Sequence, residues 1–355
     1  MQRIFVLIFL IYSGSLFSCG PFSNSKLVKN KYAEFFKTHK TKSGWFIEVL
    51  DSNKRVTARY SIDVEHSCDG VTKIAMPSAI GLVSTTYFPF VDALGMKSSI
   101  KSVFGKRNFF EGSFGKKPVN DLGSSPSVEK VLKSKLSTLF GYSLNNSDKD
   151  LFHQLLKFNY PIFIVHEFME QSPLAKAEWL KIFGIIFRKF ERSDKVFLDI
   201  EESYNKQLSK KNEMPKRLKV LVAQEYEGNW YIPGENSYIY KMLDSLGVKA
   251  LLSQGIKGRK KVSRDQIIKS LEDTDIWLPQ SNEKNVEKLF KYLGVSKDHF
   301  KNLRVFNITN KVDQKGSNDF WQTGVLRADY VLNDLRQIMS SSSESNLNLR
   351  WYEKL

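Results

Sequence analysis

The side chains best suited to catalysis are scattered along this sequence rather than grouped. The five histidines are His39, His66, His153, His166 and His299. The sequence has no Gly-x-Ser-x-Gly, phosphate-loop or HExxH motif. His166 and Glu167 are adjacent after an apolar run, but one such pair does not make a catalytic centre. We therefore expect a protein that is not an enzyme and that holds no cofactor.

A zinc or manganese site is the other chemistry that these residues could support. Such a site needs three or four His, Asp or Glu ligands that converge in the folded chain. His66, His153 and His166 could supply some of them, whereas the second half contributes only His299. A free-metal carrier therefore remains an alternative, and we assign no metal ligand.

The charge balance is strongly basic. Lys and Arg number 54 against 38 acids, a formal net charge of +16 over 355 residues. Such an excess favours anionic partners, although a solvated lysine-rich surface gives the same balance. The sequence has no zinc-finger, helix-turn-helix or RNA-binding aromatic motif, so we expect no nucleic-acid partner.

The first residues have the pattern of an export signal. A short basic start ending at Arg3 precedes an apolar stretch, Ile4–Tyr12, which is too short to span a membrane. Leu16-Phe-Ser-Cys19 then resembles a lipobox, in which Cys19 would be lipidated after cleavage. We therefore predict a signal peptide over residues 1–18 and localisation outside the cytoplasm, with a lipid anchor in the membrane.

Apolar runs and helical periodicities alternate along the rest of the chain. Strands are expected at 45–50, 56–62, 73–76, 160–165, 218–223, 275–278 and 304–308. Phe197, Ile200, Tyr204 and Leu208 form one helical stripe after a cap at Ser193. This alternation predicts an α/β fold of two similar lobes joined by one long helix. The predicted boundaries are a tether at 19–43, a first lobe at 44–192, a linker helix at 193–214, a second lobe at 215–339 and a tail at 340–355. The low-complexity part of this tail, residues 340–345, is expected to be mobile.

Several short segments resemble the helical-linker class of ABC-transporter substrate-binding proteins, which carry cobalamin, haem and ferric siderophores. These segments are Ile74–Ser78 with Ser84–Thr86, Val128–Glu129, Trp230–Gly234 with Ser237–Tyr238, Val262–Gln266 with Thr274–Trp277, and Asn318–Trp321 with Arg327–Asp329. Their order and spacing carry the resemblance, from about Lys73 to Leu335. Ala328 departs from the proline expected before the aspartate.

The resemblance implies two Rossmann-like lobes with a ligand cleft between them, a metal chelate or tetrapyrrole as ligand, and ABC permease subunits as partners. Tyr87, Trp230, Tyr231 and Trp321 fall in segments that resemble cleft-lining loops, and Arg327 could pair with an anionic group of the ligand. Packing at a lobe face is the competing interpretation for each aromatic residue. For Arg327 it is an ion pair with Asp329 or Asp319.

The resemblance also implies one acidic residue on each lobe that docks against the permease. Matched by motif, these residues are Glu129 and Asp265. Both would also suit the first turn of a helix, where the helix dipole favours an acidic side chain.

Overall fold

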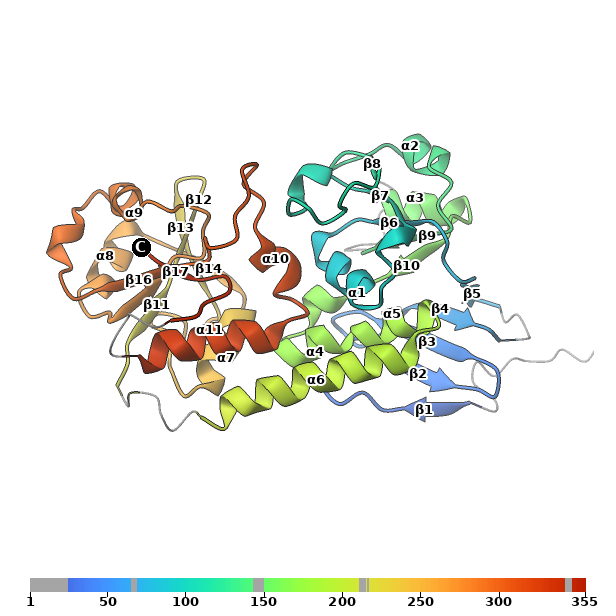
Figure 1. The fold of residues 1–355 in the computed structure, drawn as a ribbon, viewed down its shortest axis with the longest axis horizontal. Helices are drawn as coiled ribbons and strands as arrows, with labels where there is room; N and C mark the ends of the chain where they lie inside the picture. The colour runs from blue at the N-terminus through green and yellow to red at the C-terminus, as the bar shows by residue number, and fades with distance from the viewer. Residues whose placement is uncertain (1–24, 65–68, 143–149, 211–214, 216, 342–346) are drawn as a thin grey trace, which may run out of the picture.

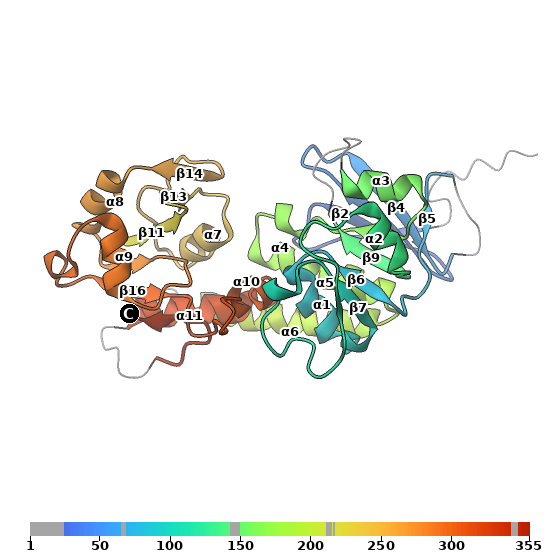
Figure 2. The ribbon, with the colours of Figure 1, turned by 90° about the horizontal axis from the view of Figure 1, so that it is seen from above.

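Two α/β lobes lie side by side, with one long helix running beneath both (Figure 1). The computed structural model describes residues 25–64, 69–142, 150–210, 215, 217–341 and 347–355. The long helix, α6 (Phe190–Leu208), packs against α5 of the first lobe and α11 of the second. Seen from above, α6 and α11 lie under the junction between the lobes (Figure 2).

The first lobe is built on a parallel five-stranded sheet in the order β10-β9-β6-β7-β8. Its strands are β6 (Ile80–Leu82), β7 (Ile100–Val103), β8 (Asn120–Asp121), β9 (Thr138–Gly141) and β10 (Ile162–Ile164). Its helices are α1 (Phe88–Ala93), α2 (Val128–Lys133), α3 (Leu151–Lys157), α4 (Pro173–Glu178) and α5 (Leu180–Ile186). Short 3-10 helices lie at Thr85–Tyr87 (η1), Lys97–Ser99 (η2), Lys106–Asn108 (η3) and Glu167–Met169 (η4). Strands β6, β9 and β10 are buried along their whole length, as the apolar residues of strands in a covered parallel sheet predict.

A second sheet precedes this lobe and packs against it. It contains β1 (Lys26–Val28), β2 (Phe36–Lys40), β3 (Trp45–Leu50), β4 (Val56–Ile62) and β5 (Thr72–Lys73), in that order. Residues 26–28 and 36–40 are thus strands, and the prediction of a tether over 19–43 is wrong from Lys26 onward. Lys37 lies on the solvent face of β2, while Phe36 and Thr38 are buried on the other face.

Buried carboxylates hold the segment between β1 and β2. Glu178 accepts hydrogen bonds from the backbone N–H groups of Lys31, Tyr32 and Ala33, at 2.8 to 2.9 Å. Glu170 accepts those of the next two residues, Glu34 and Phe35, at 3.0 to 3.1 Å. We call residues 31–35 the strap. Two glutamates thus satisfy five consecutive backbone donors, which fixes the strap against the first lobe.

The second lobe has a parallel core sheet and an antiparallel side sheet. The core order is β11 (Val220–Val222), β15 (Ile276–Leu278), β16 (Arg304–Asn307) and the antiparallel β17 (Glu353–Lys354). The side sheet comprises β12 (Gln224–Tyr226), β13 (Asn229–Pro233) and β14 (Arg259–Val262). Its helices are α7 (Tyr238–Ser245), α8 (Arg264–Leu271), α9 (Val286–Leu293), the 3-10 helix η6 (Lys297–His299), α10 (Asp319–Thr323) and α11 (Ala328–Ser340).

The linker helix begins earlier than the predicted cap at Ser193. Ser193 is fully buried inside α6, and its hydroxyl donates to the carbonyl of Phe190 at 2.6 Å. A Cβ added to Gly184 would come within 1.9 Å of the Ser193 Oγ. The small residue at 184 therefore lets α5 pack closely on α6. The predicted stripe is confirmed, because Phe197, Ile200 and Tyr204 are all buried.

The C-terminal residues also belong to the fold. Trp351 and Tyr352 are buried, and β17 pairs with β16. Asp334 on α11 accepts hydrogen bonds from the backbone N–H groups of Arg350 and Trp351 at 2.9 Å. The prediction that residues 340–355 form a tail outside the second lobe is therefore wrong for residues 347–355.

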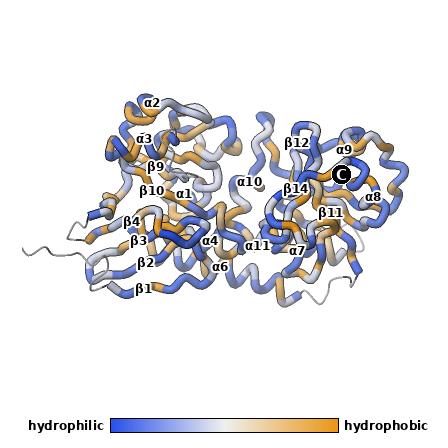
Figure 3. Tube along the Cα trace, turned by 180° about the vertical axis from the view of Figure 1, so that it is seen from behind, coloured by the Kyte–Doolittle hydropathy of each residue, from blue (hydrophilic) through white to orange (hydrophobic). Residues whose placement is uncertain are grey.

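One hydrophobic core runs continuously from the first lobe, through the helices at the junction, to the inner face of the second-lobe sheet. A smaller core covers the opposite face of that sheet. Hydrophobic residues follow the interior of both lobes in Figure 3. Within the described residues, no helix is both long and apolar enough to cross a membrane.

Candidate ligand-binding cleft between the lobes

Loops that follow the parallel strands of both lobes converge where the lobes meet. Thr85 follows β6 and Arg107 follows β7 in the first lobe, and Asn282 follows β15 in the second. All three line one cavity of about 270 Å3. Ligands of open α/β sheets bind in crevices outside the carboxyl ends of the strands. The predicted cleft between lobes is thus present at the expected edge of each sheet.

Trp321 lies at the centre of this cleft. It contributes to the cavity shared by both lobes and to two further cavities of about 320 and 420 Å3 in the second lobe. Its side chain is 48% exposed although its neighbour Phe320 is buried. Helix α10, which carries both residues, packs against η1 and α1 of the first lobe. An indole left this accessible offers a flat apolar face to a ligand.

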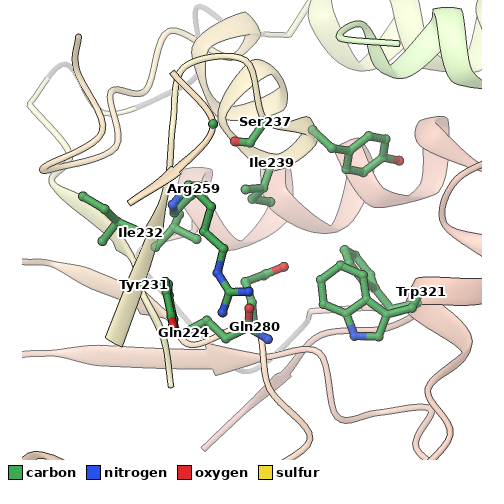
Figure 4. A pocket seen from close by; sticks show the side chains of 13 residues that line it. Gln224, Tyr231, Ile232, Ser237, Ile239, Arg259, Gln280 and Trp321 are labelled. Atoms are coloured by element: carbon green, nitrogen blue, oxygen red, sulfur yellow. The ribbon is translucent and has the colours of Figure 1, made fainter. Parts of the chain in front are cut away.

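The second-lobe wall brings Arg259 next to Tyr231 (Figure 4). The Arg259 guanidinium carbon lies 3.7 Å from the ring centroid of Tyr231 and 5.6 Å from that of Tyr226. These residues come from the neighbouring strands β12, β13 and β14. Stacking on a tyrosine fixes the planar guanidinium while leaving its N–H groups able to bind an anion.

The remaining side of the cleft is polar and basic. Arg107 of the first lobe and Lys315 of the second line the shared cavity. In the part of the chain that the structure describes, no carboxylate lies within 4.0 Å of the charged nitrogens of Arg107, Arg259 or Lys315. The cleft therefore combines an aromatic surface with cations whose charge a ligand could neutralise.

Hydrogen bonds between the lobes define the cleft floor. Gln322 accepts from the backbone N–H of Phe110 at 3.0 Å and donates to the Ser113 hydroxyl at 2.9 Å. Asp313 accepts from the backbone N–H of Glu111 at 2.8 Å. These bonds hold the loops that carry Arg107 and Lys315 next to each other.

Of the predicted aromatic residues, Tyr231 and Trp321 line the cleft and the other two do not. Trp230 is only 2% exposed and packs on Trp277, with ring centroids 5.9 Å apart. Side chains alternate along a strand, so Trp230 and Tyr231 on β13 must point to opposite faces. The prediction of Trp230 as a ligand-binding residue is wrong, because its side chain fills the smaller core.

Tyr87 also lies in the core. Its side chain is fully buried, and its hydroxyl donates to the carbonyl of Val165 at 3.4 Å. Burial raises the pKa of this phenol well above its ordinary value. Tyr87 therefore does not line the cleft as predicted, whereas Thr85 of the same 3-10 helix does.

Arg327 makes the structural ion pair that was the alternative prediction. Its guanidinium donates twice to Asp329, at 2.9 and 2.7 Å, and stacks on Tyr330. Asp329 is 1% exposed, so this pair neutralises a buried acid at the start of α11. Arg327 does not line any of the three cleft cavities.

Glu129 and Asp265 occupy equivalent places in the two lobes. Each is the second residue of its helix, behind a serine cap, at Ser127 for α2 and at Ser263 for α8. Both are exposed, and Glu129 pairs with Lys133 at 2.6 Å. The helix-dipole interpretation holds for both, and it is compatible with docking. Cys19 and the predicted signal peptide lie outside the described residues.

Sequence reasoning missed the basic residues of the cleft. Arg107 and Arg259 are two of many basic residues in a basic chain, so their type gave no signal. Position gave a signal for Arg107, which lies in the loop after the parallel strand β7, but none for Arg259, which begins the antiparallel strand β14. The structure itself adds one indication, because Gln280, two residues after β15, has a positive φ of 55°. Such backbone conformations gather at functional sites.

The comparisons with known proteins agree on the fold. The model of the periplasmic binding protein family matches residues 82–297, more than half of the chain. An uncharacterized lipoprotein of Methanocaldococcus jannaschii is 28% identical over 228 residues, which is 62% of this chain. The chain spans about half, 52%, of the length of that relative.

Solved structures of low identity share the architecture. A periplasmic haem-binding protein of Roseiflexus sp. RS-1 is 15% identical with a TM-score of 0.59, over 74% of this chain and 98% of that one. The triscatecholate siderophore-binding protein FeuA of Bacillus subtilis is 17% identical with a TM-score of 0.53, over 75% and 95%. With two α/β lobes, a linking helix and a cleft at the strand ends, the chain belongs to the periplasmic binding protein family.

Proposed function

We propose that this protein captures a large metal chelate or tetrapyrrole outside the cytoplasm and delivers it to the permease of an ABC importer. The ligand would be a ferric siderophore, haem or a cobalamin-type molecule. The observation that carries the proposal is the position of Trp321, where three cavities of the cleft meet. A flat, half-exposed indole flanked by cations suits a planar or chelated anion.

The named ligands of similar proteins support this cargo. The structures described above bind haem and a triscatecholate siderophore according to their names. Both ligands combine aromatic surface with negative charge. The cleft presents the complementary pair, aromatic rings at Tyr231 and Trp321 and cations at Arg107, Arg259 and Lys315.

Export and lipidation at Cys19 are part of the same proposal. The residues before it have the pattern of a signal peptide, and the archaeal relative is named a lipoprotein. A lipid anchor would keep a capture protein close to its permease. Mass spectrometry of the membrane fraction tests this, since Cys19→Ser should abolish the lipid-bearing N-terminal peptide.

A zinc or manganese carrier is the competing function. Among the described residues, no group of three His, Cys, Asp or Glu side chains is arranged to hold a metal ion. No observation in the cleft favours this alternative, and the binding experiment includes both ions as separate ligands.

Isothermal titration calorimetry with haemin, cobalamin and several ferric siderophores tests the proposal. We expect one of them to bind at submicromolar concentration, and Trp321→Ala to weaken that binding by about tenfold or more, because stacking on an exposed indole is lost. Calorimetry keeps the readout independent of the tryptophan that is removed.

Phe158→Ala is the matched control, since Phe158 is 62% exposed and lies outside the cleft. Its affinity should equal that of the unmodified protein. If only zinc or manganese released heat of binding, and none of the chelates or tetrapyrroles did, a metal carrier would be the better assignment. Equal affinity in Trp321→Ala would contradict the assigned site.

A further inference from the structure

A separate cavity lies where the N-terminal sheet meets the first lobe. Its volume is about 660 Å3, within the range of small-molecule sites. The turn after β3 and strand β4 form one wall, and α3, β10 and η4 form the other. The backbone N–H of Ile164 on β10 donates to the Tyr60 hydroxyl of β4 at 3.0 Å, which joins the two walls.

The cavity is independent of the cleft between the lobes. It shares no described lining residue with the three cleft cavities. One wall is built from residues 51–60, which precede the family match at residue 82. The site is therefore not formed by the two family lobes alone, and it requires the additional sheet.

Polar and apolar side chains share the lining of this cavity, and the apolar ones lie together. Tyr60 and Ile164 are buried at its base. Leu156 and Phe168 line it yet remain 47% and 43% exposed. Phe168 is held edge-on between His166 and Tyr142, with centroid distances of 5.9 and 5.7 Å. A fixed, exposed ring at a cavity mouth is a surface that an apolar ligand would cover.

The ionisable lining is mainly basic. Arg59, His153 and His166 line the cavity, against one acid, Asp51. The Asp51 Oδ1 accepts hydrogen bonds from the backbone N–H groups of Asn53 and Arg55, at 2.8 and 2.9 Å. Arg59 uses Nε for Glu48 at 3.0 Å, and its terminal nitrogens carry further donors. Arg59, although it pairs with Glu48, therefore keeps N–H donors for an anion, whereas the one lining acid already accepts two backbone hydrogen bonds.

We infer that the cavity between the N-terminal sheet and the first lobe is a second binding site, which takes a small aromatic anion such as an aromatic carboxylate or sulfonate. The rings would lie against Phe168 and Leu156. The acidic group would face Arg59 and the two histidines.

Fluorescence titration with 8-anilinonaphthalene-1-sulfonate tests this inference on the purified protein. The probe combines an aromatic body with one fixed negative charge. We expect saturable enhancement from one site, with the affinity lowered about tenfold or more by Leu156→Glu and by Phe168→Glu. Both positions are exposed, so a new carboxylate there repels the anion without disturbing the core, and circular dichroism melting confirms that each variant is folded.

Phe158→Glu is the matched control, because it adds the same charge at the end of the same helix but outside the cavity. It should bind the probe as the unmodified protein does, and so should Trp321→Ala. N-phenyl-1-naphthylamine, which has the same rings without the sulfonate, should bind more weakly.

Three results would overturn the inference. Unchanged affinity in both cavity variants would remove the site. Loss of probe binding only in Trp321→Ala would place the probe in the cleft between the lobes. Equal affinity for the uncharged probe would remove the preference for an anion. None of these results depends on the cargo proposed for the cleft.

Discussion

Glu167 is a buried carboxyl behind the cleft. It is 2% exposed, and its Oε1 accepts a hydrogen bond from the Thr86 hydroxyl at 2.6 Å. Its Oε2 has no hydrogen-bond partner among the described residues. Burial raises the pKa of this carboxyl above its ordinary value, against the opposing effects of Thr86 and Lys176. The protonated form is therefore favoured by folding.

This raised pKa predicts a stability that depends on pH. A group whose pKa is higher in the folded state contributes stability below its unfolded pKa and loses it as pH rises through the folded value. Glu167→Gln removes the titration, so its melting temperature relative to the unmodified protein should increase from pH 4 to pH 8. Differential scanning fluorimetry at several pH values measures this difference.

Glu202→Gln, at an exposed position on α6, is the control, and its melting temperature should differ from that of the unmodified protein by a constant amount. A constant difference for Glu167→Gln as well would contradict the assignment.

At the residue scale, the sequence indicated which segments reach the cleft, but not always which residue of a segment faces it. The segments around Thr85, Tyr231 and Trp321 were found by resemblance, and all three reach the cleft. Trp230 was indistinguishable from its neighbour by type, because a large aromatic serves a core as well as a cleft. Which of two adjacent residues faces a ligand depends on the register of β13, and that register is set by its partner strands.

At the scale of elements, the strap allows a test of how much a buried carboxylate adds to stability by accepting hydrogen bonds from backbone N–H groups. Glu178→Ala leaves three N–H donors of residues 31–33 without their acceptor. Of these three residues only Ala33 is buried, and leaving one buried donor unsatisfied costs about 1–3 kcal/mol. We therefore expect urea denaturation to give a free energy of unfolding lower by about 1–3 kcal/mol.

Glu178→Gln provides a graded comparison, because the amide keeps one oxygen acceptor. Its free energy of unfolding should lie between those of the unmodified protein and Glu178→Ala. Glu202→Ala removes an exposed glutamate and should change the unfolding free energy by less than about 0.5 kcal/mol. Equal losses in Glu178→Ala and Glu202→Ala would show that the strap adds nothing to stability.

The elements at the two ends of the described chain were the least predictable from sequence. Residues 26–40 are rich in lysine, and residues 347–355 form a short segment that is polar on average. Both segments are held by acceptors far away in sequence, Glu170 and Glu178 for the first and Asp334 for the second. Local composition cannot reveal such partners. The aromatic residues Phe35, Phe36, Trp351 and Tyr352 were the available signal, and all four are buried.

For the whole molecule, the shared core implies a stiff pair of lobes. The larger core passes from the first lobe into the second, and α11 packs along α6. Hydrogen bonds from Gln322 and Asp313 add contacts at the cleft floor. We expect ligand binding to change the radius of gyration by less than about 1 Å in small-angle X-ray scattering. A contraction of several ångströms would show hinge closure instead.

Docking to a permease is also a property of the whole molecule. We propose that Glu129 and Asp265, one on each lobe, face basic residues of the permease subunits. Glu129→Lys and Asp265→Lys should each reduce ligand uptake by about tenfold in cells carrying the cognate importer, because like charges disrupt docking. Calorimetry should give unchanged ligand affinity. Glu287→Lys, at the same position of α9, is the control and should leave uptake unchanged. Normal uptake in both variants would refute the assignment.

The strap has a mechanical consequence for any load applied at Lys26. Tension there would first act on the short pairing between β1 and β2, where Lys26 faces Lys40. The force would next reach residues 31–35, whose backbone is held by Glu170 and Glu178. Tyr32 also donates to Glu201 on α6, so part of the load would pass along the linker helix. The strap would thereby bear a force applied at the N-terminal side before that force reaches the loops of the cleft.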